Sequence, residues 1–211
     1  MPDVTDAPAA RRRTRMRPEE RRESILAAAT EVFAETGYRA GKVSAVAARL
    51  GVSEPVVFQN FGSKAALFAA VLDRATALAR EALGEMSRQA GPVSALLAAL
   101  LSSDHVEDLH APGSLGMLFA DAAVLTDEPG VADAAGRAVR TVAGLLAEVL
   151  RRGQAEGSVR ADLDPDAGAW WLLSLMAARP FRAAVAEDPR ALEEDLAALT
   201  LRALTASGET P

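Results

Sequence analysis

With 211 residues, the chain is long enough to bury a hydrophobic core, either as one large domain or as two small ones. Half of the residues are apolar and a quarter are charged, and no apolar run approaches the roughly 18 residues of a membrane span. The absence of cysteine excludes disulfides, thiolate metal sites and cysteine nucleophiles. The first residues carry arginines without the apolar stretch of a secretory signal, so we expect a cytoplasmic location.

The formal net charge of −6 is unevenly distributed. Residues 1–64 hold eleven Arg and Lys against eight Asp and Glu, a net of +3, whereas residues 65–211 hold twelve against twenty-one, a net of −9. A basic N-terminal part suits contact with phosphate, and an acidic remainder opposes non-specific binding to DNA. We expect the arginine-rich residues 1–17 to form a disordered arm, which either touches DNA or is merely a solvated tail.

The pattern of apolar residues predicts an all-α fold, because aromatic residues make up only 4% and no stretch alternates apolar and polar positions. The first helix begins at Pro18, carries an apolar stripe and stops at Gly37. A short helix over 44–50 follows, then a glycine turn, then a third helix that Ser53 caps and that runs through Phe58.

The central part of the chain predicts long and short helices separated by glycine, proline and polar residues. The expected elements are a helix capped by Ser63 that reaches about Met86, shorter helices over about 93–103 and 114–125, a polar loop between these that contains His105 and His110, and a long helix from about Glu128 to Arg152.

Two helices near the C-terminus each start at an Asp-Pro pair, Asp164 with Pro165 and Asp188 with Pro189. The first of them, over 165–179, contains AWWLLSLMAA, which is apolar around nearly its whole circumference and must be covered on two sides. We expect a four-helix dimer interface there, and the alternative is a monomer with an unusually buried penultimate helix. The candidate interface residues are Trp170, Leu173, Leu192, Leu196, Leu199 and Ala203, the last four on the helix over 189–206.

The stretches ILAAATEVFAETGY, from Ile25 to Tyr38, and VSAVAARLGVSEPVVFQNFGSKAAL, from Val43 to Leu67, place a glycine turn between two short helices. Such a pair presents one helix to the DNA major groove. In detail the segment resembles the DNA-binding domain of the TetR family, without a gap from Ile25 to Leu67. The matching positions are Phe33, Gly37, Tyr38, Ala47, Gly51, Val52, Ser53, Phe58, Phe61, Lys64 and Leu67.

The resemblance implies a TetR-like fold with a helix-turn-helix domain over residues 18–64, whose turn motif spans about 42–61, and an effector-binding and dimerisation domain over 65–206. It also implies a homodimer that binds double-stranded DNA at a pseudo-palindromic operator. The expected function is a repressor that a small, apolar effector releases from the operator. A transcriptional activator of the same fold is the alternative.

By resemblance, Val56 to Asn60 lie in or beside the major groove and Lys64 contacts a phosphate, which a helix N-terminus favours. Gln59 and Asn60 can each bind adenine through two hydrogen bonds, and Val56 can meet a thymine methyl. The sequence departs from the family at Lys42, where a hydroxyl is usual, and at Phe58, where a tyrosine is common. For Gln59 and Asn60 the alternative is an exposed polar residue outside the groove. The candidate DNA contacts are Lys42, Ser44, Ser53, Glu54, Pro55, Val56, Phe58, Gln59, Asn60 and Lys64.

Candidates for an apolar effector site are Met86, Met117, Phe119 and Trp171, although such residues at helical spacing also form ordinary core. A second group, His105, Glu107, Asp108 and His110, raises the alternative of a metal-dependent helical enzyme. Its spacing fits no strong metal motif, so we expect no metal, no cofactor and no enzymatic activity. A helical protein-interaction module is a further alternative, but it has no need of the Gly-Val-Ser turn joined to Lys64.

Overall fold

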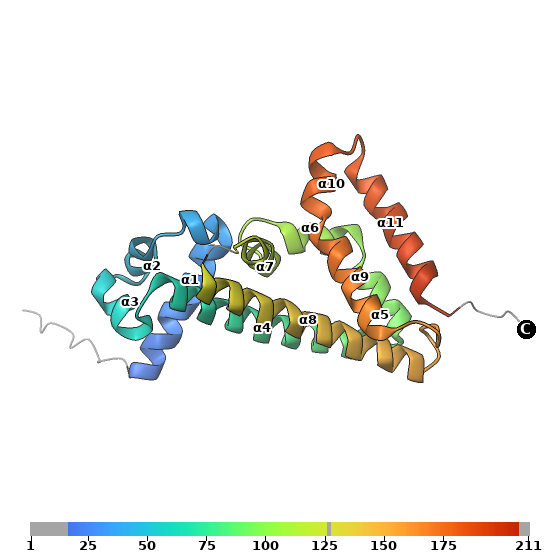
Figure 1. Cartoon of the computed structure of the whole chain (residues 1–211), viewed down its shortest axis with the longest axis horizontal. Coiled ribbons are helices and arrows are strands. Elements are labelled where there is room, and N and C mark those ends of the chain that lie inside the picture. Colours follow the sequence, from blue (N-terminus) through green and yellow to red (C-terminus); the bar gives the residue numbers. More distant parts are fainter. Residues whose placement is uncertain (1–16, 126–127, 207–211) are drawn as a thin grey trace, which may run out of the picture.

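The computed structural model describes residues 17–125 and 128–206 (Figure 1). The predicted arm, apart from Arg17, lies outside the described residues. The regular elements in the described ranges are α-helices, which confirms the expected all-α class. They are α1 (Pro18–Ala40), α2 (Val43–Leu50), α3 (Glu54–Phe61), α4 (Lys64–Gln89), α5 (Val93–Leu100), α6 (Ser103–His110), α7 (Leu115–Ala123), α8 (Pro129–Ala155), α9 (Pro165–Ala177), α10 (Arg179–Val185) and α11 (Pro189–Leu204).

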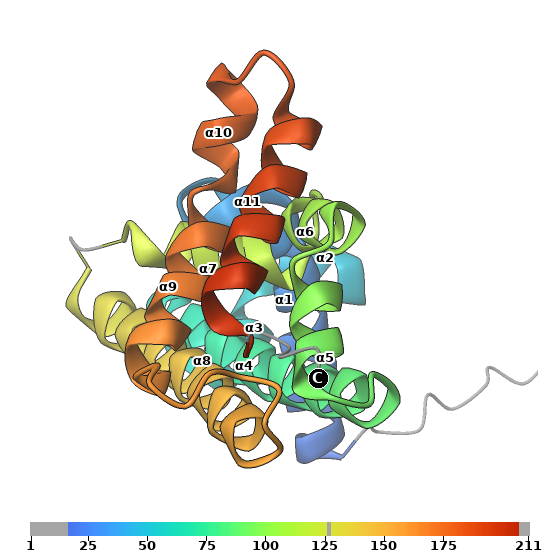
Figure 2. The same ribbon diagram turned by 90° about the vertical axis from the view of Figure 1, so that its right-hand side faces the viewer.

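The two longest helices are α4 and α8. They run side by side along the molecule and connect its two ends (Figure 1). At one end α1, α2 and α3 pack together and onto the start of α4; we call these three helices the head and α4–α11 the body. At the other end α9 lies on α8, and α11 contacts α5 and α6. Figure 2 shows that α10 and the adjoining end of α11 project beyond the rest of the body.

The proximal cluster is a buried apolar core that joins the head to the body. It includes Phe33 and Tyr38 of α1, Phe68 of α4, Leu118 of α7 and Val131 of α8. The rings of Phe33 and Phe68 meet edge to face with their centroids 5.1 Å apart. Because this core continues from α1–α3 into α4, α7 and α8, the packing does not break at the predicted domain boundary after residue 64.

The distal cluster is a second buried core, built from aliphatic side chains of α5, α8, α9 and α11. Leu96 and Leu97 of α5, Leu150 of α8, Leu172 of α9 and Leu204 of α11 are all fully or almost fully buried in it. The isolated bridge between Val159 and Thr205 holds the end of α11 against the loop before α9.

The predicted helix starts are confirmed at three capping residues. The hydroxyl of Ser63 accepts the N–H of Ala66 at 3.0 Å at the start of α4. The carboxylate of Asp164 accepts the N–H of Asp166 at 2.8 Å, and that of Asp188 accepts the N–H of Ala191 at 3.0 Å. Each cap satisfies a backbone donor that the first helical turn leaves free.

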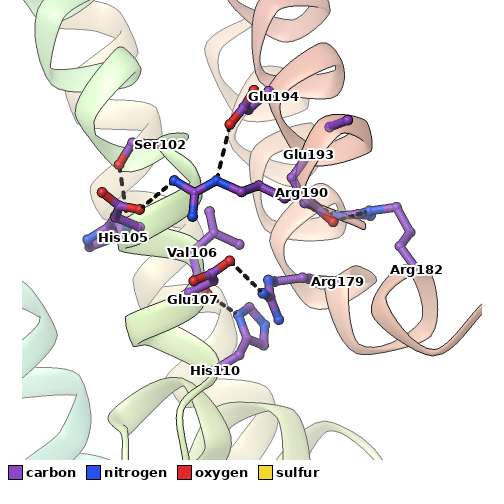
Figure 3. Close-up of polar contacts among 12 residues, drawn as sticks. Ser102, His105, Val106, Glu107, His110, Arg179, Arg182, Arg190, Glu193 and Glu194 are labelled. Atoms are coloured by element: carbon purple, nitrogen blue, oxygen red, sulfur yellow. Dashed lines mark hydrogen bonds and ion pairs between the residues drawn. The ribbon is translucent and has the colours of Figure 1, made fainter. Parts of the chain in front are cut away.

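Residues 103–110 form α6, so the prediction of a polar loop with His105 and His110 was wrong. The Ser102 hydroxyl accepts the N–H of His105 at 3.3 Å, and Val106 is buried in the core. The polar side chains that suggested a loop instead reach α10 and α11 (Figure 3): Asp104 pairs with Arg190 at 3.0 Å and Glu107 with Arg179 at 3.7 Å.

The penultimate helix is shorter than predicted, because α9 ends at Ala177 and the unpredicted α10 begins at Arg179. Pro180 explains the break: it lacks an N–H, and its ring would clash with the carbonyl of Met176 in a continuous helix. The guanidinium of Arg182 then ties α10 to α11 through both carboxylate oxygens of Glu193, at 2.7 and 2.9 Å.

Three predicted details in the head also differ from the structure. The first helix does not stop at Gly37 but kinks there (φ 71°, ψ 173°) and continues to Ala40. The third helix runs past Phe58 to Phe61, and Ser53 occupies its N-cap position without a side-chain capping hydrogen bond.

Among the described residues, no single helix has the length and apolar character to cross a membrane. The bent pair of α3 and α4, with 68° between its helices, meets the test by length and composition alone.

Candidate nucleic-acid interface

The turn between α2 and α3 requires glycine at its centre. Gly51 ends α2 with left-handed backbone angles (φ 64°, ψ 34°), which residues with a side chain rarely adopt. Its N–H donates to the carbonyl of Ala48 at 3.1 Å, and the N–H of Val52 donates to Ala47 at 3.0 Å. The turn therefore satisfies two carbonyls at the end of α2 and fixes the direction in which α3 leaves.

The third helix has one buried face and one face open to solvent. Val57 and Phe61 are buried in the proximal cluster, whereas Pro55, Phe58 and Gln59 are exposed. Phe58 leaves 40% of its surface in solvent. A base edge offers methyl groups and hydrogen-bonding atoms, so an apolar ring beside an amide side chain is chemically suited to contact one.

The other predicted residues at the start of α3 differ in their suitability. Ser53 and Glu54 are exposed, and Val56 is half-buried, which limits its reach to a thymine methyl. The carboxylate of Glu54 in the first turn interacts favourably with the positive end of the helix dipole, but it would repel a phosphate at the same point.

Asn60 is half-buried, and its side chain already has a partner within its own helix. The Nδ2 group donates to the carbonyl of Val56 at 2.7 Å, and the Asn60 carbonyl accepts from Nη1 of Arg22 at 2.7 Å. Arg22 also stacks on the ring of Phe61, with its guanidinium carbon 4.1 Å from the centroid. Bidentate binding of adenine by Asn60 would require this local hydrogen bond to break.

The predicted phosphate contacts lie at the N-terminal ends of α2 and α4. Lys42 and Ser44 are exposed at the start of α2. Lys64 is half-buried: its Nζ donates to the carbonyl of Arg39 at 3.3 Å and lies 4.6 Å from the centroid of the Tyr38 ring. The ammonium of Lys42 thus stands in solvent, whereas that of Lys64 is held against the end of α1.

Arg49 is a head cation that is already neutralised. Its guanidinium pairs with Glu35 at 2.7 Å and with Glu31 at 3.1 Å. The hydrogen bond that Arg49 donates to Glu35 is the largest cause that raises the pKa of Arg49. Arg49 is therefore a weaker candidate for a phosphate contact than Lys42, which is exposed.

Two sequence profiles match this chain. Residues 25–71 match that of the bacterial regulatory proteins of the tetR family, and residues 115–199 match that of the tetracyclin repressor-like C-terminal domain. Together the matches cover more than half of the chain and include both head and body. The chain belongs to the TetR family.

Curated relatives match this TetR-family protein over less than a third of its length. The HTH-type transcriptional activator FasR of Mycolicibacterium smegmatis is 48% identical over 64 residues, which are 30% of this chain and 29% of the relative. The HTH-type transcriptional repressor Rv3405c of Mycobacterium tuberculosis is 48% identical over 50 residues, 24% of this chain and 27% of the relative. The matched segments thus span less than a third of either relative.

Solved structures extend the similarity of fold to almost the whole chain. Reduced NemR of E. coli superposes with a TM-score of 0.74 at 20% sequence identity, covering 90% of this chain and 99% of that one. At this identity the comparison establishes the fold alone.

The predicted effector residues do not converge on one site. Met86 of α4 packs against the distal cluster, whereas Phe119 of α7 packs against the proximal cluster. Met117 is half-buried on α7, and Trp171 leaves 52% of its surface in solvent. The positions of these four residues therefore do not support a single effector site that all of them line.

A groove of about 340 Å³ instead lies between α4 and α8. Leu83, Leu145 and Val149 supply apolar surface, and Arg80 and Arg152 supply two cations. Arg152 is hydrogen-bonded to the hydroxyl of Ser87 across the groove. The remaining lining residues are Gly84 and Glu148. The groove is therefore lined by apolar side chains and by charged side chains with a net charge of +1.

The histidine-containing segment shows no metal-like arrangement: in the described ranges, no three His, Asp or Glu residues gather in a way that could hold an ion. His110 places Nδ1 2.8 Å from the carbonyl of Val106, and burial lowers the pKa of His105 (Figure 3). His105 and His110 are thus structural side chains of α6.

Sequence reasoning missed Arg22, Asp121 and Glu128 as residues that act on the head. Arg22 contacts the end of α3, while Asp121 and Glu128 reach Tyr38 from the body. These pairs are separated by 38, 83 and 90 positions, so helical periodicity carries no signal for them.

Proposed function

We propose that the chain is a transcriptional regulator that binds double-stranded DNA as a homodimer, with α3 of each subunit in a major groove of a pseudo-palindromic operator. The observation that carries the proposal is the exposed face of α3, where Phe58 and Gln59 stand in solvent; the cation Lys42 is also exposed, at the start of α2. A structural helix pair would have no reason to leave an aromatic ring and an amide side chain exposed together on α3.

The side chains divide the work of recognition. Gln59 can donate to and accept from one adenine, and Phe58 can pack on a thymine methyl. Lys42 and Ser44 meet phosphates beside the groove and set the register of α3. Since Asn60 is bonded to its own helix, we assign base reading to Gln59 first.

Self-association is supported by the apolar surface that α9 and α11 leave uncovered. Trp170 and Leu199 keep 48% and 54% of their surfaces in solvent. Thr200 and Leu204 of α11 turn inward and are buried, so the Leu199 side of that helix stays open for a second copy. Leu173, Leu192, Leu196 and Ala203 are half-buried and remain predicted interface residues.

Release from DNA is proposed to follow binding of an amphipathic anion in the groove between α4 and α8. An apolar chain would cover Leu83, Leu145 and Val149, and its acidic group would meet Arg80 or Arg152. Because α4 starts beside the head, a ligand wedged against it can tilt the head. Linkage limits the effect to the ligand's affinity ratio for the two orientations, about 1 to 3 kcal/mol or 5- to 150-fold in typical cases.

Repression is the proposed outcome, and activation is the second candidate. One curated match, over 64 residues, is to a protein named an activator, whereas a 50-residue match is to a protein named a repressor. Each match covers less than a third of the relative, so neither name decides between the two outcomes for this chain.

The test is selection of duplexes from a random library by the purified full chain, followed by affinity measurements on the selected operator and on a random duplex. Gln59→Ala should change the preferred sequence, and Lys42→Ala should weaken all duplexes while lowering the salt slope by about 1. Gln89→Ala and Arg88→Ala, exposed at the far end of α4, are the matched controls. Equal losses on operator and random DNA for Gln59→Ala would place base reading elsewhere.

The effector proposal is tested with three probes of equal chain length: decanoate, decanol and decyltrimethylammonium. Decanoate alone should raise the melting temperature and lower operator affinity, and Arg80→Ala should weaken both effects. Arg137→Ala, at an exposed position of α8 outside the groove, is the control for charge. Stabilisation by all three probes alike would contradict an anionic ligand.

A further inference from the structure

Tyr38 lies where the head meets the body. It follows the kink of α1 at Gly37 and is buried, with 4% of its surface exposed. Its ring contacts Phe68 of α4 at a centroid distance of 4.9 Å and Phe33 of α1 at 6.3 Å. The ring is thus part of the proximal cluster, and its polar atoms are left to find partners at the edge of that cluster.

Two carboxylates from the body supply those partners. The backbone N–H of Tyr38 donates to Oδ2 of Asp121, on α7, at 2.6 Å. The phenol donates to Oε2 of Glu128, the N-cap residue of α8. Hydrogen bonds to a charged acceptor are stronger than neutral ones, so each contact contributes more than an ordinary hydrogen bond.

The same residue is tied to the start of α4 on its other side. The ammonium of Lys64 lies over the Tyr38 ring, and it also donates to the carbonyl of Arg39, the next residue along α1. A further backbone bond joins Gly113, in the loop before α7, to the carbonyl of Ala34 at 3.2 Å. The last turns of α1 are therefore held by α4, α7 and α8 together.

The phenol is not required to fill the core. The two rings that pack on Tyr38 are both phenylalanines, and Glu128, which accepts the phenolic hydrogen bond, is an exposed residue. Its carboxylate could be hydrated by water if the phenol were absent. The hydroxyl therefore contributes a link between elements and little to burial.

We propose that Tyr38 is a positioning residue for DNA binding: through Asp121 and Glu128 it fixes the angle of the head on the body, and thereby the spacing of the two α3 helices in the dimer. This inference rests on the proposed function, since it presumes a dimer on an operator with two half-sites. It gives the effector a second path to the head, because α7 and α8 carry the two carboxylates.

The spacing of the two half-sites explains why loss of the hydrogen bond from Tyr38 would affect DNA binding. The two half-sites lie one helical turn of DNA apart, about 34 to 36 Å, and a dimer binds both only if its recognition helices match that spacing. A head free to tilt must lose this freedom on binding, which lowers affinity for the operator but leaves phosphate contacts on random DNA intact. The expected sign is therefore a loss of specific binding alone.

The experiment uses the full-length Tyr38→Phe variant, which keeps the ring and the backbone N–H while removing the bond to Glu128. On the operator selected by the wild type, Tyr38→Phe should lose affinity about 3- to 10-fold, the range of one hydrogen bond. Affinity for a random duplex should stay within error. The variant should also distinguish less between the operator and the same operator with one base pair inserted between its half-sites.

Glu128→Gln is the second variant, and its matched control is Asp133→Asn, which removes the same charge from an exposed position of α8. Loss of an acidic charge strengthens binding to any DNA, so the ratio of operator to random affinity is the quantity to compare. This ratio should fall about 3- to 10-fold for Glu128→Gln and stay constant for Asp133→Asn. Both substitutions lie at exposed positions, where folding tolerates them.

The outcomes separate the two proposals. If the wild type selects no duplex, the proposed function fails and the role of Tyr38 with it. If an operator is selected but Tyr38→Phe and Glu128→Gln keep wild-type affinity and spacing preference, the positioning role alone is overturned. A gain in operator affinity for Tyr38→Phe would likewise overturn it, because the contact would then oppose the bound orientation.

Discussion

The two buried cores of this protein are built from different side chains. The proximal cluster holds the aromatic rings Phe33, Tyr38 and Phe68 in mutual contact, and Tyr38 donates hydrogen bonds at its edge. The buried residues of the distal cluster are all aliphatic, and the rings of Trp170 and Trp171 on α9 are half exposed.

This difference separates two tasks that one helical bundle performs. Aromatic rings with polar ends can be held in one orientation, because the ring packs while the polar atom bonds to a fixed partner. Aliphatic side chains fill volume without setting an angle, and exposed tryptophans leave apolar surface for a partner. This contrast fits the two roles proposed above, in which the proximal core orients the head and the distal region mediates assembly.

The largest expected effect comes from charge in the open apolar surface of α11. Leu199→Glu should yield a monomer, or insoluble protein, at concentrations where the wild type is a dimer, because a carboxylate cannot be buried without a partner. Size-exclusion chromatography with light scattering measures the mass.

Val124→Glu is the control for this substitution, since Val124 is 70% exposed but lies in the segment after α7, away from α9 and α11. This variant should remain dimeric. A soluble, fully dimeric Leu199→Glu protein would remove Leu199 from the interface.

The next effect tests whether the two cores unfold separately. Phe68→Ala in the proximal cluster should cost about 3 to 5 kcal/mol of unfolding free energy, and Leu150→Ala in the distal cluster about 2 to 5 kcal/mol. Because α4 and α8 pass along both cores, we expect each variant to shift one common transition.

Denaturant titration gives the answer through two probes. Both tryptophans of the chain lie on α9, so their fluorescence reports the body alone, whereas circular dichroism reports all helices. Coincident curves for Phe68→Ala would establish one cooperative unit. A tryptophan curve that Phe68→Ala leaves in place would instead divide the molecule into two.

Sequence predicted the head well because its elements obey local rules. The glycine turn at Gly51 and the cap at Ser63 depend on residues within a few positions, and both are present in the structure. The head residues that face inward, such as Val57, also follow from helical periodicity.

The parts that sequence missed depend on distant partners. The short helix α6 was predicted as a loop because it is rich in polar side chains. In the structure these side chains find partners on α10 and α11, about 80 positions away, which no local pattern reveals. The contact of Tyr38 with Glu128 spans 90 positions and has no local pattern. The break at Pro180, by contrast, follows a local rule and could have been predicted from proline alone.

A smaller effect is expected from the buried ion pair between α10 and α11. Arg182→Met would leave the carboxylate of Glu193 buried without its partner, and should cost about 3 kcal/mol of unfolding free energy. The double variant Arg182→Met with Glu193→Leu should recover most of this loss, since neither charge is then buried. Additive losses in the double variant would show that packing, rather than the charge, determines the cost.

The smallest effect is a pH dependence of stability at Glu156, which follows the end of α8. Its carboxylate accepts the backbone N–H of Val93 at the start of α5 and the hydroxyl of Ser158, the latter at 2.7 Å. The bond from Val93, followed by that from Ser158, lowers the pKa of Glu156 below its ordinary value of about 4.5. A carboxyl with a lowered pKa stabilises the folded state above the unfolded value, and this contribution is lost as the pH falls through the folded value. The unfolding free energy of the wild type should therefore exceed that of Glu156→Gln by a constant amount above about pH 5.5, and the excess should shrink below about pH 4.5. Ser158→Ala, which removes one donor, should shift this loss toward higher pH. A difference between wild type and Glu156→Gln that stays constant down to about pH 3 would mean that the carboxylate charge does not stabilise this corner of the distal core.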